Sequence, residues 1–372
     1  MLRLNRISIS GFRSICKVTN LEFGAINVLI GANGAGKSNL IGFFRMLNSM
    51  MTGALQDYIG RSGRAQSLLH YGPKVTNQLT AALEFETEKG VSRYECRLAY
   101  AAEDMLIFTN EQVFSQLVDA TTPPSPYVLG SGHRETALRN ANAVDAPTVQ
   151  FIVGALSRLR VYQFHDTSAE SRLRATCDID DSRFLYSDGG NLAAILYRLR
   201  DEHPNRYNRL LCTIRMVAPF LDDFVMEPMG DGRKWLSLRW RGSGSEYEFG
   251  PHHLSDGTLR FIALTTLLLQ PADWLPLLIV IDEPELGLHP IALASLAEII
   301  REAAQDTQLL IATQSASLID FFDPDEIIVA ERQAGASEFS RLDGLKLKEW
   351  LDDYSLGELW RRNLIAGGLT HE

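Results

Sequence analysis

The sequence predicts an α/β fold organised around a phosphate-binding loop, and three observations support this prediction. The segment Gly31-Ala-Asn-Gly-Ala-Gly-Lys-Ser38 has the spacing of a P-loop, Gly-x-x-x-x-Gly-Lys followed by Ser or Thr. An apolar run, 26–30, precedes it as a buried strand, and residues 39–47 follow with apolar side chains at helical spacing. A second apolar run, 275–281, ends in two acids, Asp282 and Glu283. Together these features predict a P-loop NTPase.

The glycine-rich loop carries the chemistry of phosphate binding. Gly34 and Gly36 let the backbone curl so that successive N–H groups point at a β-phosphate, next to a positive helix N-terminus. We expect Lys37 to supply charge to the β- and γ-phosphates and Ser38 to ligate Mg²⁺. The nucleotide-binding positions are then Asn33, Gly34, Ala35, Gly36, Lys37, Ser38 and Asn39. An ordinary glycine-rich turn is the alternative, which the flanking strand and helix disfavour.

The composition fits a globular protein with a large core, because 45% of the 372 residues are apolar. The net charge of −10 repels polyanions, so any nucleic-acid contact must come from a local basic patch or from a partner. The four cysteines are far apart, and we expect them to be reduced and buried. The N-terminus lacks an apolar leader and no run is long enough to span a bilayer, so we expect a cytoplasmic protein without a membrane segment.

Before the P-loop, residues 4–10 alternate as a half-buried strand, and residues 11–14 follow as a turn. Arg13 lies in that turn, just ahead of the nucleotide strand, and is either a phosphate ligand or an exposed arginine. After the P-loop helix, residues 83–87 and 94–100 alternate around a Glu-Lys-Gly turn. These two runs predict an antiparallel hairpin.

The middle of the chain predicts a strand and two helices. Residues 159–164 form the strand, which ends at His165-Asp166, and helical patterns follow at 192–199 and 207–217. The two helices carry an arginine face that either contacts phosphates or is a solvated face interspersed with acids. Its members are Arg198, Arg200, Arg206, Arg209 and Arg215. Asp178-Ile-Asp180 is predicted to lie in a loop.

The last third of the chain carries two more functional signals. Leu254-Ser-Asp-Gly-Thr258 starts a helix, with Ser255 or Asp256 as its N-cap. The strand at 275–281 places Asp282 where it can hold Mg²⁺ and Glu283 where a carboxylate polarises the attacking water. Two acids at a strand end can also be surface residues, but rarely after so long an apolar run.

The order of these motifs resembles the ABC-type ATPase heads of the SMC, RecF and OLD families, in particular the RecF-like and OLD-like ones. The resemblance rests on the P-loop, on the signature segment Leu254-Ser-x-Gly, on the Walker B segment and D-loop Asp282-Glu-Pro-Glu-Leu-Gly-Leu-His-Pro290, and on a switch strand that ends in Thr313-Gln-Ser315. It implies that the protein binds and hydrolyses ATP with Mg²⁺ and dimerises on ATP. It also implies that Ser255 and Gly257 face the γ-phosphate held by the other subunit.

Other residues follow from the same resemblance. Gln314 stands where a switch histidine is usual and can donate a hydrogen bond to the γ-phosphate, but it cannot carry a proton. His289 stands where SMC proteins and transporters have the D-loop aspartate. The role of that aspartate in those proteins therefore applies less directly to this chain. Gln163 is the candidate metal-side residue of the Q-loop, with a glutamine at the edge of the core as its alternative.

The expected architecture is one ABC-type head over residues 1–372, with an antiparallel β lobe and an inserted helical hairpin. Residues 1–110 form the P-loop lobe, 111–220 the insertion and 221–372 the lobe with signature, Walker B and switch. The spacing is too short for a coiled-coil rod, and the tail lacks the acids of a TOPRIM nuclease. We expect a DNA-repair or phage-defence ATPase that gates DNA or a separately encoded nuclease. The alternative is a slow ATP switch that controls a protein partner without DNA.

Overall fold

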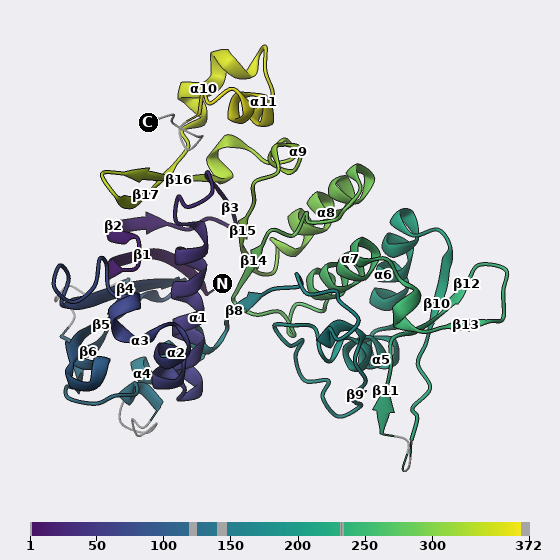
Figure 1. The fold of residues 1–372 in the computed structure, drawn as a ribbon, viewed down its shortest axis with the longest axis horizontal. Helices are drawn as coiled ribbons and strands as arrows, with labels where there is room; N and C mark the ends of the chain where they lie inside the picture. Colours follow the sequence, from purple (N-terminus) through teal and green to yellow (C-terminus); the bar gives the residue numbers. More distant parts are fainter. Residues whose placement is uncertain (1, 119–124, 140–146, 231, 233, 366–372) are drawn as a thin grey trace. The chain divides into compact units, whose positions relative to one another are not determined.

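The computed structural model describes residues 2–118, 125–139, 147–230, 232 and 234–365. The chain forms two compact units, each assembled from segments that are far apart in the sequence (Figure 1). The first unit comprises Met1–Val161, Pro276–Val280 and Asp323–Glu372. The second comprises Tyr162–Leu275 and Ile281–Phe322.

An antiparallel sheet with the strand order β2-β1-β4-β5-β6-β7 forms one part of the first unit. The predicted hairpin is confirmed, because Leu83 pairs with Tyr94 and Thr87 with Gly90 across β4 and β5. Residues of β4 alternate between buried and half-buried positions, with Leu79, Leu83 and Phe85 among the buried ones, as a sheet with one covered face requires. The strands are β1 (Arg3–Phe12), β2 (Ile15–Glu22), β4 (Gln78–Thr87), β5 (Gly90–Ala101), β6 (Met105–Leu117) and β7 (Tyr127–Gly130).

The P-loop strand and helix form the other part of this unit. β3 (Ile26–Ile30) is buried throughout and runs parallel to β16 (Ile327–Gln333), which pairs antiparallel with β17 (Ala336–Arg341). α1 (Lys37–Thr52) buries the predicted face, and Phe43 packs edge-to-face on Phe12 of β1 with ring centroids 5.9 Å apart. The remaining helices are α2 (Leu55–Arg61), α3 (Arg64–Leu68), α4 (Pro147–Ser157), α10 (Gly344–Leu351) and α11 (Leu356–Arg361).

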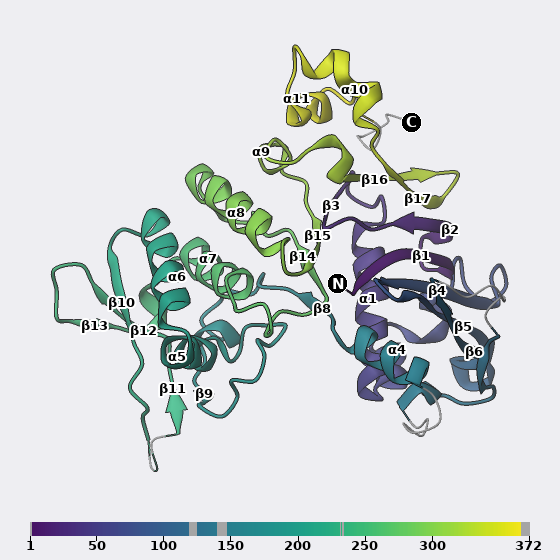
Figure 2. The same cartoon turned by 180° about the vertical axis from the view of Figure 1, so that it is seen from behind.

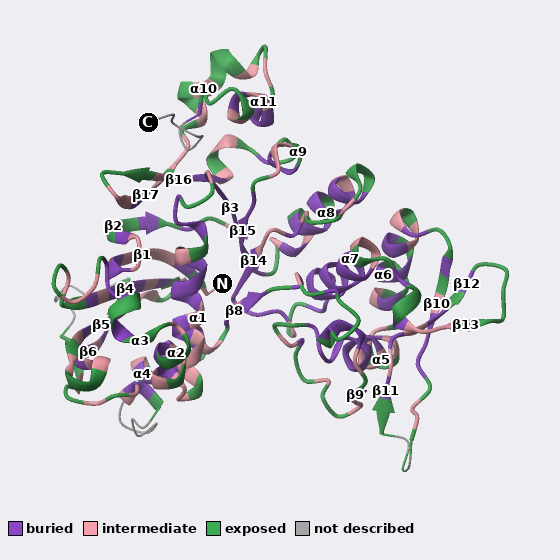
Figure 3. Cartoon of the chain, viewed as in Figure 1, coloured by how far each residue is buried: buried purple, intermediate pink, exposed green. Residues whose placement is uncertain are grey.

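The second unit is mainly helical. α5 (Leu192–Glu202) and α6 (Pro204–Val217) form the predicted hairpin, and they lie beside α7 (Asp256–Leu268) and α8 (Pro290–Ala303) in both views (Figures 1 and 2). From Leu259 to Leu268 every residue of α7 is buried, so this helix is the core of the unit (Figure 3). Short strands complete the unit: β9 (Cys177–Asp178), β10 (Leu221–Val225), β11 (Trp235–Leu236), β12 (Arg239–Gly242) and β13 (Glu248–Phe249).

Four elements flank or contain the predicted site residues Gln163, Asp282 and Gln314. β8 (Leu159–Tyr162) ends one residue before Gln163, and β14 (Leu278–Asp282) ends at the first acid. β15 (Gln308–Ala312) and α9 (Ala316–Ile319) flank Gln314.

Three expectations about the sequence need correction. Cys96 and Cys177 are buried, but Cys16 and Cys212 are exposed, so only two of the four belong to the interior. Asp178 lies in β9, which pairs with β11, and not in a loop. The strand at 159–164 is shorter than predicted, because the N–H of Gln163 already bonds to the carbonyl of Ser187, 2.9 Å away.

Most arginines of the helical hairpin face are paired with acids, whereas Arg200 donates to the carbonyl of Met226 at 3.4 Å. Arg198 bonds Glu202 at 3.0 Å on its own helix. Arg209 reaches Glu302 at 2.5 Å and Arg215 reaches Asp222 at 3.0 Å. These pairs match the interpretation of a solvated face interspersed with acids, and they reduce the positive charge that the face presents.

Candidate functional site

The phosphate loop lies between β3 and α1, where the sequence predicts it. Gly34 and Gly36 have φ of 81° and 117°, in the region that favours glycine. A Cβ on Gly36 would also lie 2.1 Å from Ser337 Oγ, so no larger residue fits there. Gly36 is the N-cap of α1 and provides no side-chain cap, which leaves the first amides of the helix for a ligand.

Lys37 is buried, and its ammonium is turned back onto the loop that precedes it. Nζ donates to the carbonyls of Gly31 and Ala32, the second at 3.2 Å. Asn33, Gly34 and Ser38 are exposed beside it. A phosphate group offers a stronger, charged acceptor than these carbonyls, and the contact of Lys37 with phosphate stays a prediction.

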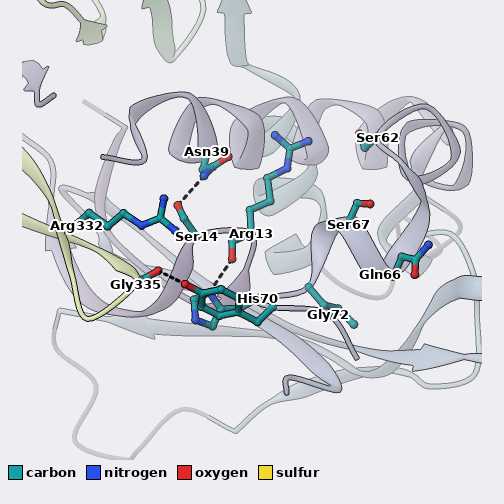
Figure 4. A pocket seen from close by; sticks show the side chains of 12 residues that line it. Arg13, Ser14, Asn39, Ser62, Gln66, Ser67, His70, Gly72, Arg332 and Gly335 are labelled. Carbon is teal, nitrogen blue, oxygen red and sulfur yellow. Dashed lines mark hydrogen bonds between the residues drawn. The ribbon is translucent and has the colours of Figure 1, made fainter. Parts of the chain in front are cut away.

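Arg13, which we considered as a phosphate ligand, lines a pocket of about 480 Å³ beside α1 (Figure 4). Its backbone has a φ of 50° and is fixed by His70, whose Nδ1 lies 2.7 Å from the Arg13 carbonyl. The guanidinium lies against α1 at Gly42, where an added Cβ would be 3.0 Å from Nη1. Arg13 thus extends past the start of the helix, and its contact with phosphate stays a prediction.

Asn39 is already engaged at the same edge of the pocket. Its Nδ2 donates to Ser14 Oγ at 2.6 Å (Figure 4). Ser14 Oγ in turn lies 2.6 Å from Ser337 Oγ. The chain of hydroxyls ties the first turn of α1 to the β1–β2 turn and to β17. We expect Asn39 to support the loop through these bonds as well as to face the nucleotide.

In the second unit the two predicted hydrolytic residues are in contact. Glu283 follows β14 directly, and Gln314 follows β15; Gln314 Nε2 donates to Glu283 Oε1 at 2.8 Å. Glu283 has a φ of 43°, an uncommon conformation for a non-glycine residue, and its N–H donates to the carbonyl of Ala312 at 2.7 Å. Such backbone strain concentrates at functional sites.

Gln163 and Asp282 are linked through a residue to which sequence reasoning gave no role. His165 Nε2 lies 2.8 Å from the carbonyl of Asp282, and its Nδ1 lies 3.0 Å from Gln163 Nε2. The first contact requires the proton on Nε2, which leaves Nδ1 to accept from the glutamine amide. His165 therefore fixes the end of the Walker B strand and orients the Gln163 side chain.

Ser255 is the N-cap of α7, which was one of the two predicted possibilities beside Asp256. Its Oγ accepts from the N–H of Thr258 at 3.2 Å, and the residue is exposed. Gly257 approaches the next loop so closely that a Cβ would lie 2.2 Å from the Gly287 carbonyl. The signature segment is thus a rigid, exposed start of a buried helix.

Two buried arginines hold this segment in place. Arg174 donates to the carbonyl of Leu254 at 3.2 Å and to Asp256 Oδ1 at 3.0 Å. Arg260 donates to the carbonyls of Phe164 at 2.9 Å, His165 at 3.1 Å and Leu286. Burial lowers the pKa of Arg260, because removal from water disfavours the charged guanidinium. Arg260 thereby joins the signature helix to the segments that follow β8 and β14.

A family model described as "AAA domain, putative AbiEii toxin, Type IV TA system" matches residues 26–320, which include the P-loop, the signature, both acids and Gln314. The chain belongs to this AAA family. It is a P-loop ATPase that hydrolyses ATP. No curated protein matches the chain.

Two solved structures are similar to this AAA ATPase. One is an SMC head bound to the C-winged helix domain of ScpA, with a TM-score of 0.59 and 16% identity, covering 93% of this chain and 99% of that one. The other is an SMC head domain with an extended coiled coil, bound to the C-terminal domain of ScpA derived from Pyrococcus furiosus, with a TM-score of 0.55 and 16% identity over 95% and 99% of the two chains. At this identity the likeness shows the fold alone, and it confirms the predicted ABC-type head fold.

His289 has a structural task in this ATPase. It is the N-cap of α8, and its Nδ1 accepts from the N–H of Ile291 at 3.4 Å.

Among the helices of the described residues, none combines the length and the apolar character that crossing a bilayer requires.

Proposed function

We propose that this ATPase binds Mg-ATP at Lys37, Ser38 and Asp282, dimerises on it, and uses the ATP-bound state to control a partner. The contact between Glu283 and Gln314 is the observation that supports hydrolysis best. It combines a carboxylate that accepts a proton from water with an amide that senses the γ-phosphate position. Gln314 cannot move a proton, so Glu283 is the general base.

The residues proposed for the metal fit Mg²⁺. Ser38 supplies a hydroxyl oxygen and Asp282 a carboxylate oxygen, and Mg²⁺ takes few protein oxygens because substrate phosphates and water complete its shell. Within the described ranges no group of three or more His, Cys, Asp or Glu side chains could hold a metal ion. When bound, the ion neutralises charge on the phosphates. Gln163, held by His165, is proposed to face the metal side of the site.

Dimerisation is proposed from the signature segment. Ser255 and Gly257 are exposed or half-exposed, although Arg174 and Arg260 hold the surrounding chain firmly. A rigid segment with an accessible hydroxyl is suited to a γ-phosphate held by a second copy of the chain. Two heads related by a two-fold axis would then enclose two nucleotides.

The dimer is tested with the variant Glu283→Gln, which keeps ATP from being consumed. Light scattering with Mg-ATP is expected to show the mass of two chains, and with EDTA in place of Mg²⁺ the mass of one. Phosphate release by the unmodified protein, with and without EDTA, tests the hydrolysis in parallel. A protein that stays monomeric in Mg-ATP contradicts the dimer.

For the biological role we propose a RecF-like or OLD-like ATPase in DNA repair or phage defence, which gates DNA or a nuclease encoded separately. One observation favours the alternative, a slow ATP switch for a protein partner: the hairpin arginines Arg198, Arg209 and Arg215 are paired with acids. The two similar SMC heads also have a protein partner, ScpA, in their structures.

Duplex DNA distinguishes the two roles. Binding by Glu283→Gln is expected to be weak, to be stronger with ATP because dimerisation doubles the local basic patches, and to fall steeply with salt. For a few phosphate contacts, affinity should drop by about tenfold or more between ~50 and ~200 mM salt. Arg209→Ala on α6 should weaken it, whereas Arg61→Ala on α2, equally a salt-bridged surface arginine, should not. Absence of binding at both salt concentrations would favour the protein switch.

A further inference from the structure

Glu285, two residues after Glu283, contacts the segment that carries Gln314. Its Oε1 accepts a hydrogen bond from Thr313 Oγ1 at 2.6 Å and another from the N–H of Gln314 at 3.2 Å. Thr313 is fully buried, and its Oγ1 accepts in turn from the N–H of Ser315 at 2.9 Å. One carboxylate oxygen therefore fixes the chain where β15 ends and α9 begins.

The other oxygen of Glu285 makes no such contact. Oε2 is shielded from solvent and has no hydrogen-bond partner among the described residues. Burial raises the pKa of Glu285, and the charge of Glu283 adds to this effect. Because Oε1 already accepts two hydrogen bonds and Oε2 is shielded from solvent, the geometry favours Glu283 over Glu285 as the general base.

The contacts of Glu285 lead to the catalytic carboxylate through Gln314. The main chain of Gln314 is bonded to Glu285, and the side chain of Gln314 is bonded to Glu283 at 2.8 Å. Glu283 and Glu285 are also joined through the buried Pro284. The three residues form a closed loop of contacts, in which moving Glu285 moves the donor that orients Glu283.

We propose that Glu285 is a positioning residue for ATP hydrolysis: it fixes the main chain at Thr313 and Gln314, so that Gln314 holds Glu283 oriented toward the attacking water. The inference rests on the proposed role of Glu283 as the general base. Glu285 acts as a hydrogen-bond acceptor and not as a charge. A glutamine, whose amide oxygen accepts the same two bonds, fulfils the role and an alanine does not.

Steady-state ATPase kinetics of five variants test this inference: Glu285→Ala, Glu285→Gln, Gln314→Ala, the double variant Glu285→Ala/Gln314→Ala, and Glu298→Ala as the control. Glu298 is an exposed acid on α8, outside the site. Glu285→Ala is expected to lower kcat by about 10- to 100-fold, the usual cost of losing a supporting contact, with KM and ATP affinity changed less than about threefold. Glu285→Gln should restore most of that loss, and Glu298→Ala should match the unmodified protein.

The double variant identifies the route of the effect. If Glu285 acts through Gln314, removing both should lower kcat no further than the more damaging single change, within about threefold. Multiplied effects would show that Glu285 acts independently of Gln314, and would overturn the inference. So would a Glu285→Gln variant as slow as Glu285→Ala, because the charge would then be what matters.

Two further outcomes separate this inference from the proposed function. Normal kcat in Glu285→Ala, with an active unmodified protein, overturns the positioning role and leaves the ATPase standing. An unmodified protein without ATPase activity overturns both. If Glu285→Ala fails to fold, Thr313→Val replaces it, since it removes one donor to Glu285 at nearly constant volume. It should lower kcat with ATP affinity retained, and an unchanged kcat would overturn the inference.

Discussion

Replacing Glu283 by glutamine is expected to leave ATP binding intact and to lower kcat by orders of magnitude. Glutamine keeps an oxygen that accepts from Gln314 Nε2, so the geometry of the pair is preserved while the basic oxygen is lost. General-base catalysis contributes about 10²- to 10⁴-fold, which sets the size of the loss. Because Glu283 acts mainly as the bond to water forms, the effect belongs to kcat and not to KM.

Lys37→Ala is the matched contrast to this change. It removes the buried ammonium that the loop carbonyls hold ready for the phosphates, and is expected to abolish binding or hydrolysis. Equilibrium binding of a fluorescent ATP analogue, together with single-turnover phosphate release, separates the two effects. Comparable turnover by Glu283→Gln and the unmodified protein would remove Glu283 from the catalytic role.

The local pattern of the sequence predicted most of the elements that carry these residues. The alternation of apolar and polar residues identified the β4–β5 hairpin. Apolar residues at helical spacing identified α1 and the α5–α6 hairpin. The P-loop needed only its spacing and its flanking strand and helix. These features depend on residues within a few positions of one another, which a sequence shows directly.

The contacts that orient the site depend on residues far apart, and so escaped prediction. His165 lies 117 positions before the Asp282 carbonyl that it bonds, and Glu285 lies 28 positions before Thr313. Spacing assigns each side chain to a face of a strand or helix but does not select its partner. The left-handed backbone of Glu283 was equally hidden, because glutamate has no preference for it. Only the position of Glu285 in the segment Asp282-Glu-Pro-Glu285, close to the predicted acids, indicated from the sequence that it could belong to the site.

A mixture of two inactive variants is expected to recover ATPase activity if the nucleotide site is composed of two subunits. Lys37→Ala loses the charge that holds the phosphates. Ser255→Arg introduces a bulky cation at the exposed N-cap of α7, where the γ-phosphate of the opposed nucleotide is proposed to dock. Each variant alone should be inactive, for these different reasons.

Subunit exchange brings the two lesions together in one site of each mixed dimer. That site loses both functions, while the other combines an unmodified Lys37 with an unmodified Ser255. At equal mixing about half of the dimers are mixed, so roughly a quarter of all sites should be intact and the rate should approach a quarter of the unmodified rate. This value holds if the two sites hydrolyse independently.

A dimer in which the two sites depend on each other would give a different result that can also be measured. If hydrolysis needs both sites, the mixed rate stays near zero, so light scattering must report in parallel whether the mixed chains dimerise on ATP. Ser255→Ala is the milder control: it removes the hydroxyl and the helix cap, which costs about 1 kcal/mol of stability, without adding a charge. A normal rate from pure Ser255→Arg, or a protein that remains monomeric with ATP bound, would contradict the composite site, because Ser255 would then have no nucleotide to complete.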